Sequence, residues 1–166
     1  MIQRIQSVFL LLLALAMVAM LFLPLWSKTD ATTNETVVLT AWTLKSHILN
    51  KQGDIVSAGN LPAKSAFIIG MLAIAAAVVA LYEIFQYKNR LNQMKLGLLN
   101  TLVIAALLGT SFYYAAYVGA EMVKAGNNGA YEAGFYLPML ALLLNALANR
   151  FIKRDEDLVR SVDRLR

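Results

Sequence analysis

Four long apolar runs dominate the chain and limit what it can fold into. They cover residues 5–25, 66–87, 98–119 and 134–148. The only charged residue inside them is Glu83, and the last run reaches the length of the others only when residues 131–133 and 151–152 are added. Crossing a hydrocarbon core takes about 20 apolar residues. The pattern therefore predicts an all-α integral membrane protein built as a bundle of four transmembrane helices.

The composition agrees with this class and excludes others. Hydrophobic residues make up 59% of the 166 residues, charged residues make up 15%, and the mean hydropathy is +0.59. A soluble domain is about half apolar and a quarter charged. The chain has no cysteine, which excludes disulfides, thiolate metal sites and cysteine nucleophiles.

We expect one membrane domain. The crossings are predicted at residues 5–25, 65–87, 97–119 and 132–152, the external loops at 26–64 and 120–131, the cytoplasmic loop at 88–96 and the cytoplasmic tail at 153–166. The first run begins like a signal peptide, but it stays apolar for longer and fits a signal anchor.

Basic residues are divided unequally between the two sides of this topology. Ten lie at the termini or between the second and third crossings: Arg4, Lys88, Arg90, Lys95, Arg150, Lys153, Arg154, Arg160, Arg164 and Arg166. Five lie in the external loops: Lys28, Lys45, Lys51, Lys64 and Lys124. Lys and Arg accumulate on the cytoplasmic side of a membrane. Both termini are therefore predicted to be cytoplasmic.

The first external loop carries strand and turn signals. The segment 36–44 is β-branched and apolar, and Gln52-Gly53-Asp54 favours a turn before another short apolar segment. We predict a small β hairpin or sheet that rests on the outer ends of the helices through Trp42. It is either a structural lid or a cap that binds a ligand or partner. The only histidine, His47, lacks acidic companions at ligand spacing, so no metal site is expected.

Small residues line two of the predicted helices. They are Gly70, Ala73, Ala77 and Ala80 on the second crossing, and the pairs Ala105 with Gly109 and Ala115 with Gly119 on the third. Small residues let helix backbones approach closely in lipid. A compact bundle is predicted.

Four polar residues are predicted at membrane depth near the cytoplasmic face. They are Glu83, Asn100, Asn145 and Asn149, and Thr101 is placed to join them. Such a cluster can coordinate an ion, hold a lipid headgroup or relay a proton. Alternatively, it forms only interhelical hydrogen bonds, while Glu83 reaches outward to Lys88 or Arg90.

The tail predicts a narrow amphipathic helix. Glu156 and Arg160 are four residues apart, and Leu158, Val162 and Leu165 fall on one stripe. It is either a solvated extension of the last crossing, an anchor on the inner leaflet or a helix that docks a partner. The candidate docking residues are Arg154, Leu158, Arg160, Val162, Asp163 and Leu165.

Catalytic motifs are missing from the sequence. It contains no GxSxG, no phosphate-binding glycine loop and no HExxH, and no second intramembrane acid accompanies Glu83. We therefore expect no enzymatic activity, no cofactor and no nucleic-acid partner.

Three segments carry a resemblance to a known family. MIQRIQSVFLLLLA, YKNRLNQMKLGLLN and LANRFIKRDEDLVRSVDRLR resemble, in the same order, an uncharacterised family of four-helix inner-membrane proteins from Bacteroidetes-type bacteria, classed as a domain of unknown function. The resemblance implies a bacterial inner membrane and cytoplasmic termini, and no activity. The positions matching its motifs are Arg4, Gln6, Arg90, Asn100, Asn149, Arg150, Lys153, Asp155, Glu156, Arg160, Asp163 and Arg164.

Three functional hypotheses follow. The first is a non-enzymatic accessory or scaffold subunit of a larger membrane complex, which contacts the lipid bilayer and either a membrane-protein partner or further copies of itself. The alternative is a small ion or lipid channel or transporter that acts as an oligomer and uses Glu83 with Asn100 and Asn145. The third is a membrane enzyme that acts on lipid.

Overall fold

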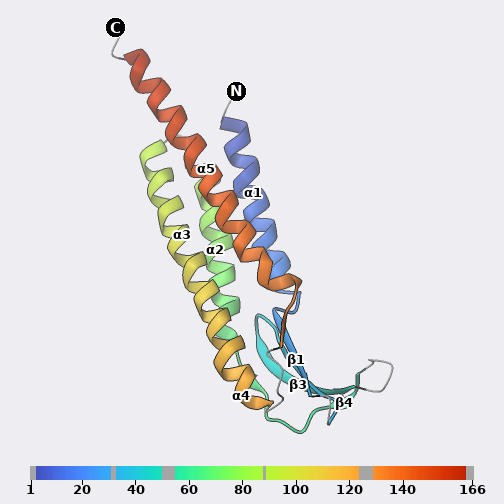
Figure 1. Ribbon diagram of the computed structural model, residues 1–166. Helices are drawn as coiled ribbons and strands as arrows, with labels where there is room; N and C mark the ends of the chain where they lie inside the picture. Colours follow the sequence, from blue (N-terminus) through green and yellow to red (C-terminus); the bar gives the residue numbers. More distant parts are fainter. Residues whose placement is uncertain (1–2, 31–32, 50–54, 88, 124–128, 164–166) are drawn as a thin grey trace.

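Long helices run along the molecule, and a small β sheet lies at one end of it, near α4 (Figure 1). The computed structural model describes residues 3–30, 33–49, 55–87, 89–123 and 129–163. The first helix begins and the last helix ends at the same end, which we call the terminal end. The opposite end, which carries the sheet, is called the sheet end. A mainly helical fold with a small antiparallel sheet is thereby confirmed.

The four long helices surround a common interior. They are α1 (Gln3–Met20), α2 (Phe67–Phe85), α3 (Arg90–Tyr113) and α5 (Ala133–Asp163). α3 continues into a π-helical stretch, η1 (Tyr114–Gly119), and then into the short α4 (Ala120–Met122). α1 packs against α2 and α5, and α3 packs against the same two helices.

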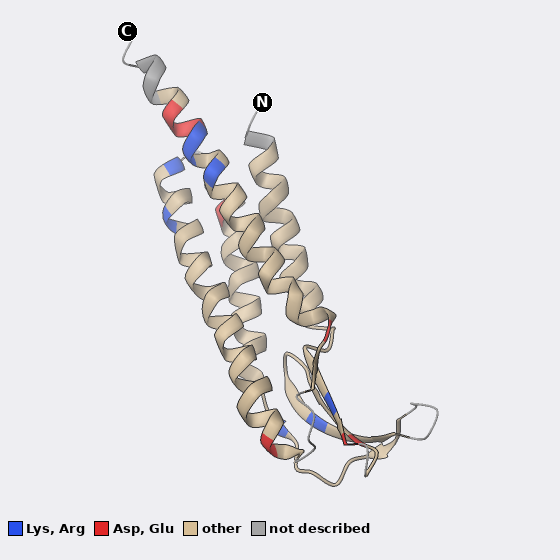
Figure 2. Ribbon diagram, viewed as in Figure 1, with Lys and Arg blue, Asp and Glu red and all other residues tan. Residues whose placement is uncertain are grey.

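The outer faces of these helices are apolar. Val78 is 58% exposed, Leu102 is 68% exposed and Leu143 is 64% exposed, while most charged residues of the long helices lie near their ends (Figure 2). Within the described residues, three helical stretches are long and apolar enough to cross a membrane: Phe67–Phe85, Arg90–Met122 and Ala133–Val159. Such exposed apolar surfaces suit a lipid environment.

The first helix is shorter than the apolar run that predicts it. α1 ends at Met20, and its apolar part is Ile5–Met20, whereas the crossing was expected to extend to residue 25. Pro24 lacks a backbone N–H and disfavours helix at the residue before it. The Leu25 N–H instead donates to Leu39 O at 2.8 Å, so this part of the run joins the sheet.

Helical structure extends into three predicted connections. α3 begins at Arg90, so most of the predicted loop 88–96 is helical, and the Asn89 Oδ1 atom caps it by accepting from Asn92 N at 3.3 Å. At the other end, α4 carries the same helix through Met122. α5 continues to Asp163 and includes most of the predicted tail.

The sheet is larger than the expected hairpin. Its strands are β1 (Trp26–Asp30), β2 (Glu35–Leu39), β3 (Thr43–Leu49), β4 (Ile55–Ala58), β5 (Lys64–Ser65) and β6 (Ala130–Tyr131). The order is β4-β3-β2-β1-β6, with β5 paired to β3, and every pairing is antiparallel. β6 follows α4, so both predicted external loops contribute to one sheet.

Two tryptophans join the sheet to the helices. The Trp42 ring centroid lies 5.7 Å from that of Phe67, and a Cβ at Gly70 would stand only 2.7 Å from the Trp42 ring, so the predicted contact of Trp42 with a helix end is made at the start of α2. Trp26 is fully buried between Gly119 and Gly129, where added Cβ atoms would also overlap its ring. Gly129 has a φ of +70°, which only glycine adopts readily.

The predicted lines of small residues are used unequally. Gly70, Ala73, Ala77 and Ala80 are all buried on the inner side of α2, and Ala115 and Gly119 are buried beside the sheet. Ala105 and Gly109 are instead exposed on α3, with nothing within 4 Å of a Cβ built at Gly109. The first two lines therefore bring elements of this chain together, and the third does not.

Candidate functional site

The interior between the helices changes character along its length. Toward the sheet end it is filled by apolar side chains such as Met17, Ile69 and Leu107, all fully buried. Toward the terminal end it contains five polar side chains that are at most 4% exposed, which we call the polar layer: Gln6, Glu83, Gln93, Asn100 and Asn145. α1, α2, α3 and α5 each contribute at least one of them.

α2 and α3 are joined within the polar layer by one hydrogen bond. The Gln93 Nε2 atom donates to the Glu83 backbone carbonyl at 3.3 Å. Gln93, Gly97 and Asn100 follow one another at spacings of four and three residues and are all buried, so they form one inward stripe on α3. This stripe places Asn100 deeper in the interior than Gln93.

α3 and α5 are joined around Gly97. The Asn145 Nδ2 atom donates to Gly97 O at 2.8 Å and to Thr101 Oγ1 at 2.9 Å. Thr101 Oγ1 donates in turn to Gly97 O at 2.9 Å. A Cβ at position 97 would overlap the side-chain amide of Asn149, so any larger residue there would force that amide to shift. The structure thus brings Asn145, Asn149 and Thr101 together around one glycine of α3.

Glu83 and Asn100 do not fit the alternative in which the polar residues form only interhelical hydrogen bonds and Glu83 reaches outward. Both are fully buried, and within the described part of the chain neither Glu83 carboxylate oxygen nor either Asn100 amide atom has a hydrogen-bond partner. Glu83 therefore does not reach outward. Arg90, one of the two partners expected for it, pairs with Asp155 instead, at 3.2 Å between side chains and 2.7 Å from Arg90 Nη1 to Asp155 O. Lys88, the other expected partner, lies outside the described residues.

Two members of the polar layer were not expected in a buried site. Gln6 was named only as a position that matches the family motifs, and Gln93 fell in a predicted loop. The spacing of Gln93 and Asn100, seven residues apart, would have indicated one helix face had the start of α3 been placed at Arg90.

The candidate docking residues lie on the last turns of α5. Arg154 and Leu158 are exposed. The backbone of Arg160, Val162 and Asp163 is helical, whereas their side chains and all of Leu165 lie outside what the structure describes. The predicted stripe is thus helical from Leu158 through Val162.

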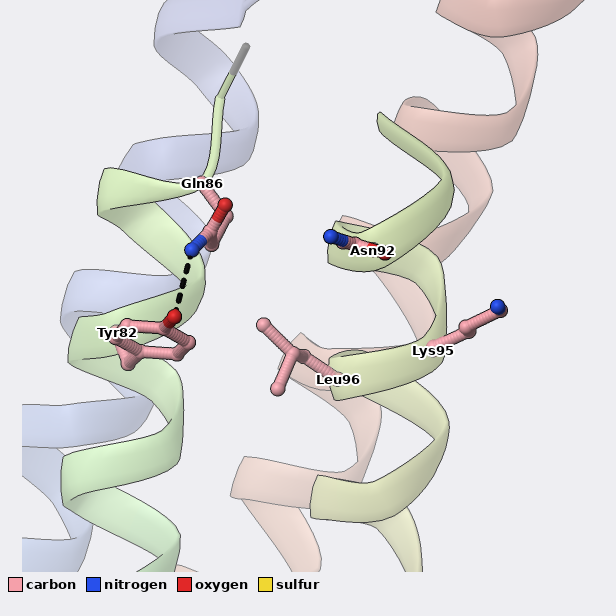
Figure 3. Close-up of a pocket in the computed structure, with 5 residues that line it drawn as sticks. All are labelled: Tyr82, Gln86, Asn92, Lys95 and Leu96. Atoms are coloured by element: carbon pink, nitrogen blue, oxygen red, sulfur yellow. Dashed lines mark hydrogen bonds between the residues drawn. The ribbon is translucent and has the colours of Figure 1, made fainter. Parts of the chain in front are cut away.

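Two grooves lie on the outside of this end. One, of about 260 Å³, runs between α2 and α3 and is lined by Tyr82, Gln86, Asn92, Lys95 and Leu96 (Figure 3). The other, of about 310 Å³, is lined by Met94, Leu98, Asn149, Arg150 and Lys153. In the first groove Gln86 Nε2 donates to Tyr82 Oη at 2.7 Å, and Leu96 points across toward α2 while Lys95 points away (Figure 3).

Apolar helices around a buried polar layer, closed at one end by a sheet, define a helical protein suited to a membrane. The chain belongs to the family described as a domain of unknown function (DUF4293), whose model matches residues 2–165. Membership of an uncharacterised family, which the terminal motifs suggest, is thereby confirmed. The chain matches no curated protein.

Proposed function

We propose that this protein is a non-enzymatic integral membrane protein with four crossings that serves as an accessory or scaffold subunit of a larger membrane complex. The observation that carries this proposal is the length of α5. It runs without a break from Ala133 to Asp163 and projects beyond the other helices at the terminal end (Figure 1). A helix that continues past its own packing partners is available to bind another protein.

The fourth crossing is assigned to α1 because of its neighbours. The apolar part, Ile5–Met20, spans about 24 Å at 1.5 Å per residue, slightly less than a core ~30 Å thick. The bilayer adapts to such a mismatch at modest cost. Because α1 lies beside α2 and α5 within one packed group, a membrane that contains those helices also contains α1.

The distribution of charges favours placing the terminal end in the cytoplasm of a bacterial cell, below its inner membrane. Arg90, Arg150, Lys153 and Arg154 lie at that end. Lys28, at the sheet end, keeps its charge although it is buried and bonded within the fold. The larger number of basic residues at the terminal end is the asymmetry on which the positive-inside rule depends.

Purification from native membranes tests the docking role. The tagged full-length protein, extracted in mild detergent, is expected to retain a stoichiometric partner identified by mass spectrometry. Deleting residues 154–166 or introducing Leu158→Glu should release that partner. Val159→Glu is the matched control, because it also replaces an exposed apolar residue with Glu but lies about 100° around the helix from Leu158. Retention of the partner after tail deletion would contradict the docking role.

A second function, ion or lipid transport by an oligomer, is favoured by a different observation. Glu83 and Asn100 are fully buried between helices and have no hydrogen-bond partners among the described residues. Polar groups at membrane depth are costly and commonly serve ion pathways. Transport predicts that Glu83→Gln abolishes function while Leu158→Glu does not, which is the reverse of the result expected for a scaffold.

A further inference from the structure

The polar layer and the adjacent Asn149 contain more unpaired hydrogen-bond acceptors than donors. In the described part of the chain, the buried oxygens without a partner are Glu83 Oε1 and Oε2, Asn100 Oδ1, Asn145 Oδ1 and Asn149 Oδ1. The buried nitrogens without a partner are Gln6 Nε2 and Asn100 Nδ2. Polar atoms inside a membrane protein need partners because no bulk water is present. A positively charged ligand satisfies such a set of oxygens, whereas an anion does not.

The orientation of the Asn145 amide is fixed by its neighbours. Thr101 Oγ1 gives its hydrogen to Gly97 O, so toward Asn145 this hydroxyl is an acceptor. Gly97 O is also an acceptor. A reversed Asn145 amide would place its oxygen against two acceptors. The Asn145 nitrogen therefore faces α3, and Oδ1 remains available as a ligand.

Glu83, Asn100 and Asn145 are brought to one region by the packing of three helices. The bond from Gln93 to Glu83 fixes α2 against α3, and the bonds of Asn145 fix α5 against α3 between Gly97 and Thr101. Side chains lean toward the N-terminus of their own helix. Because α2 and α3 run in opposite directions, this rule directs Glu83 and Asn100 toward each other along the interior.

The described interior supplies no positive charge to the Glu83 carboxylate. The groups that face the interior from α1, α3 and α5 at this level are the amides of Gln6, Gln93, Asn100 and Asn145. The Arg90 guanidinium is held by Asp155, while Lys95, Arg150 and Lys153 are exposed on the outside. One carboxylate in a region of low dielectric is balanced by one positive charge, and a divalent ion would leave an excess.

From these observations we infer that Glu83, Asn100 and Asn145 form a binding site for one monovalent cation, either an alkali-metal ion or a proton. Carboxylate and amide oxygens are ligands that hard cations prefer. A proton on Glu83 instead turns the carboxyl group into a donor for one amide oxygen. In the described residues no three acidic or histidine side chains gather to hold a divalent metal. The site requires neither the tail nor a docking partner, and it gives the transport alternative a substrate class.

Salt-dependent stability of the full-length protein in detergent tests the alkali-metal form. The thermal unfolding midpoint is measured in sodium, potassium or choline chloride at equal ionic strength. It should rise with the concentration of sodium or potassium and not with choline, because a ligand that binds only the folded state stabilises it by mass action. Glu83→Gln should abolish this dependence. Glu121→Gln, the same substitution at an exposed acid of the sheet end, should retain it.

Infrared spectroscopy tests the proton form on the same samples. If the ligand is a proton, the midpoint is the same in all three salts, and a buried carboxylic-acid band appears and disappears reversibly with pH in the wild type and in Glu121→Gln. That band is missing in Glu83→Gln. The inference is overturned if the salts act alike and the band is either absent or unchanged across the pH range. Should Glu83→Gln fail to fold, the wild-type series alone decides between these results.

The test separates this inference from the docking role. Deleting residues 154–166 should leave the salt or pH response intact, even when it releases a partner. A response lost on tail deletion would contradict a site formed by Glu83, Asn100 and Asn145 alone.

Discussion

Two charged side chains are buried in the described part of the molecule, and the fold treats them differently. Lys28, on β1 at the sheet end, is 5% exposed, and its Nζ atom donates to Val123 O at 2.7 Å and to Ala120 O at 3.4 Å. These carbonyls belong to the end of α4, where a helix has unpaired acceptors and a partial negative charge. The acceptors that stabilise the buried Lys28 ammonium group therefore all come from the protein itself.

Glu83 at the opposite end has no such explanation within the described chain. It is fully buried, its carboxylate oxygens lack partners, and the one arginine expected beside it is bonded to Asp155. A buried charge without a partner is strongly unfavourable, so the group is neutral or binds a ligand. The comparison indicates that the buried charge at the sheet end is fully paired within the chain. The buried charge at the terminal end is not paired among the described residues, as expected for a site that binds a ligand.

The largest effect is expected when Lys28 is changed to Met. The substitution keeps the length and apolar stem of the side chain but removes the donor to the Val123 carbonyl, in a buried hydrogen bond, and to the Ala120 carbonyl, in a partly buried one. Leaving such acceptors unpaired costs about 1–3 kcal/mol. The thermal unfolding midpoint in detergent should fall clearly. Lys45→Met is the control, because Lys45 lies on β3 and is exposed. Equal midpoints for the two variants would show that Lys28 is not a structural cation.

Much of the helical fold could be predicted from the sequence, because a run of apolar residues determines both helix and membrane depth locally. The boundaries were less accurate where two local signals compete. Pro24 lies in the non-helical end of the first apolar run, just before β1, and Asn89 caps a helix in a segment that its basic residues mark as a loop. Pro24 and Asn89 are both visible in the sequence, but the prediction gave more weight to the apolar run in the first case and to the basic residues in the second.

The pairing of β1 with β6 could not be predicted in the same way. Trp26 pairs with Tyr131, more than a hundred residues along the chain, and neither β6 nor its neighbours show a strand pattern of any length. The predicted polar residues Glu83, Asn100, Asn145 and Asn149 all lie near the terminal end. Which of them form hydrogen bonds depends on how each helix is rotated about its own axis. That rotation is set by the packing of the helices against one another, which the sequence pattern of a single helix does not determine.

An intermediate effect is expected when Asn145 is changed to Leu. This residue is a partnered member of the polar layer, since its nitrogen donates to Gly97 O and Thr101 Oγ1 of α3. Interhelical hydrogen bonds of this kind contribute about 0.6–2 kcal/mol. A moderate fall in the thermal midpoint, smaller than that of Lys28→Met, is the expected result. An unchanged midpoint would place Asn145 with the unpartnered residues and remove the distinction between them.

The smallest effect, and one of opposite sign, is expected when Asn100 is changed to Leu in the absence of alkali cations. Asn100 is fully buried, and neither of its amide atoms has a partner among the described residues. Replacing an unsatisfied polar group by an apolar one of similar size is neutral or stabilising, by up to about 1 kcal/mol. The thermal midpoint should therefore stay level or rise slightly in choline chloride. A fall comparable to that of Asn145→Leu would mean that Asn100 is already bonded in the empty protein. The contrast between a completed sheet end and a receptive terminal end would then be lost.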